Sequence, residues 1–302
     1  MEPIPFDKRA GKIWFNGQTV NWPDVKIHVL NHGLHYASCV FEGERVYDGE
    51  IFKLVEHTER LFHSASRLGI EIPYSQESLN KACIDIVKIQ NVKNGYVRPV
   101  VWRGSEMMAI SAQKTKIHVA IATWEWGSYF DPNLKLKGIK LNISKWRRPA
   151  PNTIPWDTKA SGLYMICTLS KHEAEKEGFT DSLMLDFQEN IAEATGANIF
   201  FKNDKDEIHT PIPDSFLDGI TRRSIIEIAK SKNIKIIERK IKPDELSEFS
   251  GCFLTGTAAE VTPVSQIDKY KFKVCNLIKD LSKSYQELVR KKKMILIIYF
   301  IQ

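Results

Sequence analysis

The sequence predicts a mixed α and β protein of two domains, and three observations support this fold class. The chain has 302 residues, which is long for one hydrophobic core and natural for two. Patterns typical of strands and of helices alternate along it. A stretch rich in Trp, Gly and Pro at residues 124–133 interrupts this alternation. We therefore expect a small α+β domain at 1–125, an interdomain loop at 126–136 and a larger C-terminal domain at 137–302.

Composition excludes several classes of protein. Hydrophobic residues make up 43% and charged residues 26%, as in an ordinary globular chain, so extensive disorder is not expected. The net charge of +6 comes from 43 basic and 37 acidic side chains that are mixed throughout, so no nucleic-acid partner is expected. The five cysteines are odd in number and lack any C-x-x-C spacing. This pattern favours reduced thiols in a cytoplasmic protein.

The N-terminal half opens with a predicted hairpin. Lys12–Phe15 and Thr19–Trp22 flank Asn16-Gly17, a dipeptide typical of a tight turn between two strands. The apolar spacing after Val55 predicts a helix, and Gly69 supplies the residue at which it ends. This helix is expected at Val55–Leu68, and a second one at Gln76–Gln90. Strands are expected at Tyr96–Trp102 and Ile117–Ala122.

The C-terminal half begins with a strand and a stiff loop. Prolines 149, 151 and 155 restrict the backbone of the loop Arg147–Pro155, which leads to Lys159. Asn203–Asp206 predicts the turn of a later hairpin. The expected strands are Ile139–Ser144, Leu183–Asp186, Ile191–Ala194, Ala197–Lys202, Glu207–Thr210, Ile234–Lys240 and one ending at Phe253-Leu254. The expected helices are Ser161–Glu177, Thr221–Ser231 and Asn276–Arg290.

The C-terminal tail has an unusual composition. Lys291–Lys293 is followed by the apolar run Met294–Ile301, which is far shorter than the ~20 residues that span a bilayer. A basic and apolar membrane tether is one interpretation. A terminal strand, an interface segment or an altered reading frame are the others, and they are favoured, although the sequence does not choose among them.

Two segments have the chemistry of an anion site. Asp218–Arg223 places Gly219 and Thr221 directly before a helical pattern, where free backbone N–H groups and the helix dipole attract negative charge. Thr255–Ala259 flanks a glycine with hydroxyl residues and allows close approach of a ligand to the backbone. Plain helix capping by Thr221 and a simple strand-to-turn junction remain the alternatives.

Two single residues stand out for their surroundings. Lys159 follows the proline loop among small and apolar neighbours, where loss of solvent would lower its pKa and make the amine a nucleophile. Glu193 lies between two apolar strand segments, and a buried Glu needs a cationic or proton-sharing partner. A surface Lys at a helix start and a solvent-facing Glu are the alternatives. The scattered histidines, His32 and His35 among them, match no metal spacing, so no metal is expected.

Taken together, these segments resemble the fold-type IV pyridoxal-phosphate enzymes, and most closely the bacterial branched-chain amino acid aminotransferases. The resemblance runs from about Ile13 to Pro263. It implies a two-domain architecture like that of D-amino acid aminotransferase. Its motifs are His32–Tyr36 with Phe41-Glu42-Gly43, His57–Leu61, Tyr96–Pro99, Ala150–Thr153, Lys159–Tyr164, Glu193–Phe200, Leu217–Arg222 and Gly256–Glu260.

The resemblance implies pyridoxal 5'-phosphate as cofactor and a role for each matching residue. Lys159 would form the Schiff base and then shuttle the substrate proton, Glu193 would face the ring nitrogen, and Tyr164 would bond the ring hydroxyl. The residues implied to hold the phosphate or to contact the cofactor beside it are Arg60, Leu217, Gly219, Ile220, Thr221, Gly256 and Thr257.

The resemblance also implies a substrate pocket that accepts both an apolar side chain and that of glutamate. Phe41, Trp126, Tyr129 and Tyr164 would line an aromatic box, and Tyr36 would reach in from a neighbouring subunit. Arg98, with Tyr129 and Tyr36, would meet the distal carboxylate of glutamate. Thr257, Ala258 and Tyr96 would bind the α-carboxylate. A homodimer is then the minimal unit, and a homohexamer is a further possibility that the family implies.

The implied function is amino-group transfer between L-leucine, L-isoleucine or L-valine and 2-oxoglutarate by a ping-pong mechanism. D-amino acid transamination, aminodeoxychorismate lysis and a non-catalytic homologue remain the alternatives. The chain departs from the family pattern at Ala197-Asn198, where Glu-Asn is usual, and at Asp268–Lys273, where a Gly-rich turn is usual. The tail after Arg290 has no counterpart in the family pattern.

Overall fold

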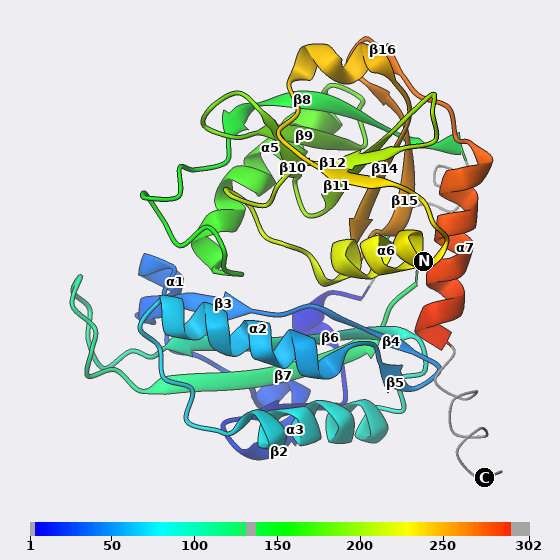
Figure 1. Cartoon of the computed structure of the whole chain (residues 1–302). Helices are drawn as coiled ribbons and strands as arrows, with labels where there is room; N and C mark the ends of the chain where they lie inside the picture. The colour runs from blue at the N-terminus through cyan, green and yellow to red at the C-terminus, as the bar shows by residue number, and fades with distance from the viewer. Residues whose placement is uncertain (1–3, 128, 131–136, 291–302) are drawn as a thin grey trace, which may run out of the picture. The chain divides into compact units, whose positions relative to one another are not determined.

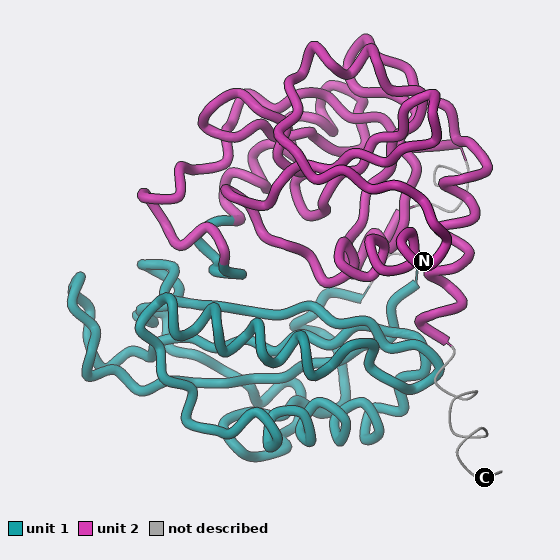
Figure 2. Tube along the Cα trace, viewed as in Figure 1, with its two compact units in different colours: residues 1–127, 158–163 teal, residues 128–157, 164–302 magenta. Residues whose placement is uncertain are grey.

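The computed structural model describes residues 4–127, 129–130 and 137–290, so the C-terminal tail and most of the expected interdomain loop lie outside the described residues. The chain forms two compact units (Figures 1 and 2). Unit 1 comprises residues 1–127 and 158–163, and unit 2 comprises residues 128–157 and 164–302. The segment 158–163, expected within the C-terminal domain, therefore groups with unit 1. Its backbone explains why, because Ala160 forms a β-bridge with Val40.

Unit 1 is built on one sheet with strand order β2-β1-β7-β6-β4-β5, and β3 also pairs with β6. The expected hairpin is confirmed, and its turn uses the left-handed backbone at Asn16 and Gly17, with φ of 49° and 89°. All pairs in this sheet are antiparallel. The strands are β1 (Lys12–Phe15), β2 (Gln18–Asn21), β3 (Cys39–Phe41), β4 (Glu44–Tyr47), β5 (Glu50–Ile51), β6 (Gly95–Arg103) and β7 (Ile117–Glu125).

Two amphipathic helices pack against each other and against this sheet. Helix α2 (Leu54–Arg67) contacts β3, and α3 (Gln76–Ile89) contacts β1, β6 and β7. Both helices match the expected ranges to within a residue or so. The short helix α1 (His32–Tyr36) was not expected, because five residues are too few to show a helical period. Two 3-10 turns, Phe6–Lys8 and Trp22–Asp24, complete the unit.

Unit 2 contains a mixed sheet that closes on itself. Its order is β10-β9-β8-β15-β14-β11-β12-β13, and the additional pairing of β10 with β11 closes six strands into a ring. Strands β8 and β15, β8 and β9, and β12 and β13 pair in parallel. The strands are β8 (Ile139–Arg147), β9 (Asp181–Leu185), β10 (Ile191–Ala194), β11 (Asn198–Asn203), β12 (Ile208–Thr210), β13 (Ile236–Glu238), β14 (Phe249–Gly256), β15 (Glu260–Ile267) and β16 (Tyr270–Lys271).

Among the described residues of unit 2, three helices pack on the sheet or on each other. Helix α5 (Met165–Lys176) packs on β8 and β9, α6 (Ile220–Ser231) on β14, and α7 (Asn276–Arg290) on β15 and α6. The helix expected from Ser161 instead begins with a 3-10 turn, Ser161–Tyr164. A further 3-10 helix spans Pro243–Glu248.

The segment that departs from the family pattern folds without a glycine. Asp268 takes the left-handed conformation with φ of 45° between β15 and β16, and its N–H donates to the Leu141 carbonyl at 2.9 Å. Phe272, 7% exposed, joins the core of unit 2. The altered turn is therefore a well-packed part of this unit.

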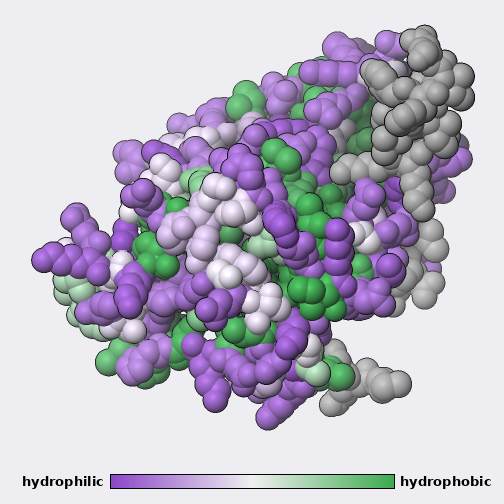
Figure 3. All heavy atoms as spheres, turned by 90° about the horizontal axis from the view of Figure 1, so that it is seen from below, coloured by the Kyte–Doolittle hydropathy of each residue, from purple (hydrophilic) through white to green (hydrophobic). Residues whose placement is uncertain are grey.

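The surface drawn in Figure 3 carries hydrophobic residues in small groups among hydrophilic ones, as globular proteins do. In the part of the chain that the structure describes, no helix is both long and apolar enough to cross a bilayer.

Candidate active site

Lys159 is held in unit 1 through its backbone. Its N–H donates to the buried Ser64 hydroxyl of α2 at 3.0 Å, and its carbonyl accepts from Phe41 N–H at 3.2 Å. The segment thus lies along β3 like a short extra strand. The alternative of a surface lysine at a helix start is not what the structure shows, because Lys159 lies before the 3-10 turn and is partly buried.

The environment of the Lys159 amine opposes its charge. Burial lowers the pKa of the Lys159 amine below its ordinary value, and the positive charges of Arg60 and Arg98 add to this effect. The negative charge of Glu42 acts in the opposite direction. The Lys159 Nζ lies 4.9 Å from the centre of the Phe41 ring. A lysine in this setting carries a more available amine lone pair than an exposed one.

Arg60 is fixed by a buried carboxylate beside the lysine. Its Nε and Nη2 donate to Glu42 Oε1 and Oε2 at 2.6 and 2.9 Å, a bidentate pair. His57 Nδ1 lies 2.7 Å from Glu42 Oε2, and Glu42 is fully buried. Burial acts to raise the pKa of Glu42, but the charges of Arg60 and His57 outweigh it and hold this pKa far below its ordinary value. The guanidinium plane of Arg60 therefore has a fixed direction.

Four expected substrate residues cluster in the same unit. The Arg98 guanidinium lies over the rings of Phe41 and Tyr96, at 4.6 and 5.3 Å from their centres. Tyr96 and Trp126 meet edge to face at 4.6 Å. The hydroxyl of Tyr96 packs so closely on Gly43 that a Cβ there would lie 1.7 Å from it. The cluster combines an apolar wall with one fixed cation.

Two further aromatic candidates, Tyr36 and Tyr129, are exposed. Tyr36 ends α1 with 43% of its surface accessible, and its ring lies 4.6 Å from that of His32. Tyr129 belongs to unit 2, is 45% exposed and stacks edge to face on Phe130 at 4.7 Å. Their roles in a pocket stay predictions.

The register of unit 2 aligns three polar residues across neighbouring strands. Glu193 on β10 pairs with Asn198 on β11, and Asn198 pairs with Thr255 on β14. All three are buried. The Thr255 hydroxyl is enclosed without a hydrogen-bond partner among the described residues, and such an atom suggests a ligand group or water nearby. Glu193 is therefore buried, and the alternative of a solvent-facing Glu is not what the structure shows.

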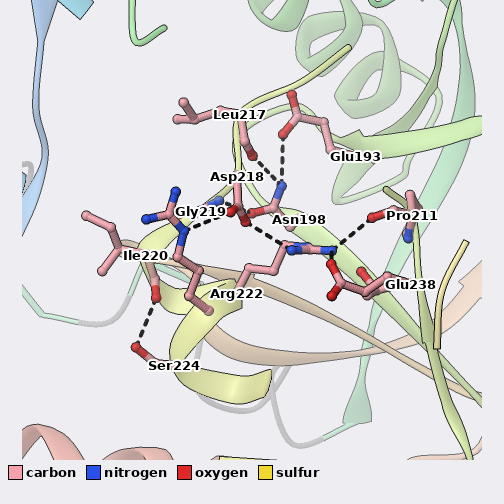
Figure 4. A network of polar contacts seen from close by, with 12 residues as sticks. Glu193, Asn198, Pro211, Leu217, Asp218, Gly219, Ile220, Arg222, Ser224 and Glu238 are labelled. Carbon is pink, nitrogen blue, oxygen red and sulfur yellow. Dashed lines mark hydrogen bonds and ion pairs between the residues drawn. The ribbon is translucent and has the colours of Figure 1, made fainter. Parts of the chain in front are cut away.

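Asn198 connects Glu193 to the segment before α6 (Figure 4). Its amide nitrogen donates to the Leu217 carbonyl at 2.9 Å and lies 3.4 Å from Glu193 Oε2. Its amide oxygen accepts from Gly219 N–H at 3.1 Å. A Cβ on Gly219 would lie 2.3 Å from that oxygen, so a larger residue would disturb this junction.

The start of α6 has the features of an anion site. Gly219 is its N-cap and supplies no side-chain cap, and the first turn carries no acidic residue. Ile220 and Thr221 are buried there, so plain capping by Thr221 is not what the structure shows. Thr257 and Ala258 lie in the turn that joins β14 to β15, directly after Gly256. Both segments expected to bind anions therefore belong to unit 2.

Arg148 is an additional residue of this site. It is 3% exposed, and its Nε lies 3.4 Å from Glu193 Oε1. The sequence placed Arg148 in the proline loop but assigned it no role, and Glu42 and Ser64 were likewise given none. The signal that existed for Arg148 is its place as a basic residue in the proline loop that leads to Lys159. No local signal identified Ser64.

Tyr164 stands at the junction of the 3-10 turn and α5, where it is half-buried and its carbonyl accepts from the Thr168 hydroxyl at 3.1 Å. Among the described residues, no group of three or more His, Cys, Asp and Glu side chains is arranged to hold a metal ion.

Comparisons with known proteins give consistent matches. A family model described as Amino-transferase class IV matches residues 39–267. A probable branched-chain-amino-acid aminotransferase of Rickettsia felis is 42% identical over 294 residues, covering 96% of this chain and 100% of that protein. A solved structure of the branched-chain amino acid aminotransferase of T.th. with pyridoxamine 5'-phosphate has a TM-score of 0.90 and 36% identity, covering 94% of this chain and 96% of that one. The structure of the same enzyme complexed with N-(5'-phosphopyridoxyl)-L-glutamate gives 0.89 and 35%, with 94% and 96% covered.

Proposed function

The chain belongs to the class IV aminotransferases, and from this premise we propose that it exchanges amino groups between branched-chain L-amino acids and 2-oxoglutarate. The enzymes of this family use pyridoxal 5'-phosphate, and the matched structures hold forms of it. The donors would be L-leucine, L-isoleucine and L-valine, and the products the corresponding 2-oxo acids and L-glutamate.

The residues present fit this cofactor. It carries an aldehyde, a basic ring nitrogen and a phosphate, which require an amine, an acid and an anion site. Lys159 supplies an amine of lowered pKa, Glu193 a buried carboxylate, and the start of α6 a helix N-terminus whose first turn lacks acidic residues. The enclosed Thr255 hydroxyl, which lacks a partner among the described residues, also suits a bound polar group.

We assign the catalytic role to Lys159 and the cofactor-holding roles to the residues that the resemblance implies. When bound, the cofactor supplies a carbonyl that exchanges the amine and a ring that accepts electrons from the substrate Cα. The Nζ of Lys159 would hold the cofactor and would move the proton of the substrate Cα. Glu193 would lie against the ring nitrogen and favour its protonation, and Tyr164 would hydrogen-bond the ring hydroxyl. Arg60, Ile220, Thr221 and Thr257 would hold the phosphate, with Leu217, Gly219 and Gly256 shaping their segments.

The substrate side of the proposal rests on the cluster in unit 1. Phe41, Tyr96 and Trp126 provide an apolar wall for a branched side chain, and Arg98 provides a cation for the distal carboxylate of glutamate. We further assign Tyr129 to this pocket, and Thr257 and Ala258 to the α-carboxylate. A matched structure is complexed with a phosphopyridoxyl derivative of L-glutamate, and this supports an acidic substrate.

We also propose that the chain works as a homodimer or a larger homo-oligomer in the cytoplasm. Tyr36 and Leu34 of α1 are 43% and 64% exposed. Ile110, 84% exposed, follows Ala109, whose carbonyl oxygen lies 3.0 Å from Nε2 of His32 in α1. Exposed apolar residues gathered around one short helix are typical of an interface. Tyr36 would then serve the pocket of the neighbouring subunit.

The observation that carries the function is the Lys159 amine held beside Arg60 and Arg98. Its test is Lys159→Ala in the purified protein. The variant is expected to lose the visible absorbance of covalently bound cofactor and all measurable transamination of L-leucine. Lys145→Ala, which removes a 65% exposed lysine side chain, is the control and should change neither. Normal absorbance and turnover in Lys159→Ala would refute the proposal.

A further inference from the structure

The Glu193 carboxylate is held from two sides by groups that received no role above. Arg148 Nε lies 3.4 Å from one oxygen, and Asn198 Nδ2 lies 3.4 Å from the other. The side chains of Arg148 and Glu193 are only 4% and 11% exposed. Water therefore screens this ion pair little, so each of the two buried charges is stabilised by the other.

Arg148 is itself fixed before any ligand arrives. Its N–H donates to the Leu185 carbonyl at 2.8 Å, which ties its backbone to the end of β9. Its Nη1 donates to the Cys167 sulfur of α5 at 3.6 Å. Burial raises the pKa of the Cys167 thiol to about 11, so this partner is neutral at physiological pH. Cys167 thus orients the guanidinium, and Glu193 supplies negative charge beside it.

The geometry points to Arg148 as a positioning residue that keeps Glu193 ionised and directed at the cofactor ring nitrogen, with Asn198 anchoring the second oxygen. This inference rests on the proposed role of Glu193. A proton shared between the carboxylate and the ring nitrogen has two positions. A positive charge adjacent to the carboxylate and farther from the nitrogen favours the position on nitrogen, because it stabilises the carboxylate more than it destabilises the ring cation.

The test uses holoenzyme loaded with cofactor that carries 15N at the ring nitrogen, whose NMR shift reports protonation directly. In Arg148→Gln the 15N signal is expected to move toward the position of an unprotonated ring, and kcat for L-leucine falls while KM changes little. Arg148→Lys keeps a positive charge and should stay near the wild-type shift. Arg147→Gln is the matched control, since Arg147 is the adjacent arginine and pairs with Glu189 on the surface.

Each result separates this inference from the proposed function. A wild-type 15N shift in Arg148→Gln, together with a changed shift in Glu193→Gln, overturns the role of Arg148 alone. An unchanged shift in Glu193→Gln overturns the role of Glu193 itself. If Arg148→Gln fails to fold, the double variant Glu193→Gln with Arg148→Gln tests whether Glu193 is the partner that Arg148 requires. It should fold, because neither charge is left unpaired, and its failure to fold would show that Arg148 serves other partners.

Discussion

At the scale of single residues, two buried glutamates two positions apart have opposite surroundings. Glu42 accepts from Arg60 and His57 and stays ionised. Glu44 is also fully buried, but both of its oxygens lack a hydrogen-bond partner among the described residues. Burial raises the pKa of Glu44 well above its ordinary value, and the charge of Glu42 adds to this while that of Arg60 opposes it. Glu44 thus destabilises the folded protein and does not help to fix Arg60.

This difference predicts the effect of Glu44→Leu on stability. The variant should gain about 1 to 3 kcal/mol in free energy of unfolding at pH 7, the usual cost of an unsatisfied buried polar group. Because the folded pKa lies above the unfolded one, the wild type loses stability as pH rises above about 4.5, and the variant does not. Urea unfolding at pH 4 and pH 7 measures the gain, which should be larger at pH 7. Glu71→Leu is the exposed control, and an equal gain there would contradict the prediction.

Arg98 leads to a prediction about substrate choice. Its guanidinium is the cation that lies over the Phe41 and Tyr96 rings, so it suits a distal carboxylate and contributes little to an apolar side chain. Arg98→Gln should raise the KM for L-glutamate by about tenfold to a hundredfold, equivalent to about 1.4 to 2.8 kcal/mol, and leave that for L-leucine nearly unchanged. Steady-state kinetics with both donors checks it. Equal losses for both donors would remove the assigned role.

At the scale of elements, strand register decides what the site contains. The pairing of β10 with β11 both closes the strand ring of unit 2 and sets Glu193 opposite Asn198. Asn198 in turn bonds the backbone on both sides of Asp218 (Figure 4). One side chain therefore joins the acid to the beginning of α6. The departure at Ala197 leaves this Asn in place.

Removing that connection should weaken cofactor binding. Asn198→Ala leaves the Gly219 N–H and the Leu217 carbonyl without the partner they have now, and the loop before α6 loses its fixed position. We expect the Kd for pyridoxamine 5'-phosphate to rise about tenfold, in line with the cost of about 1–3 kcal/mol for buried groups left unpaired. Equilibrium dialysis of the cofactor-free protein measures it. Asn203→Ala, at the other end of β11, should not change the Kd, and equal effects of both would contradict the connection.

At the scale of the whole molecule, the proposed exchange of Tyr36 between subunits is open to a mixing experiment. Lys159→Ala and Tyr36→Ala should each be nearly inactive alone. If Tyr36 serves the neighbouring subunit, a mixed dimer contains one intact site, and random mixing restores about a quarter of wild-type activity. If Tyr36 serves its own chain, mixing restores nothing. The activity of co-refolded variants, with the assembly size from analytical ultracentrifugation, distinguishes the two outcomes.

Most elements of regular structure were predictable because their signals are local. The turn at Asn16-Gly17, the apolar spacing of α2 and α3, and the hairpin around Asn203–Asp206 depend on a few neighbouring residues, and the structure confirms them. The short elements α1 and β3 to β5 were missed, because so few residues carry too little periodicity. The strands depend on pairing with β6 or, for β5, with β4, and α1 depends on packing, which are properties of the folded chain.

The sequence by itself determined the family and the identity of the main chemical groups, because the order and spacing of the motifs can be read from the residues alone. It therefore named Lys159, Glu193 and the two segments that are expected to bind anions. Only the tertiary structure decided that 158–163 joins unit 1, that Glu42 fixes Arg60, and that Arg148 and Asn198 flank Glu193. The partners of Arg60 and Glu193 are from 5 to 45 residues away from them in the chain. Strand register and burial set such contacts, and neither can be read from the residues on their own.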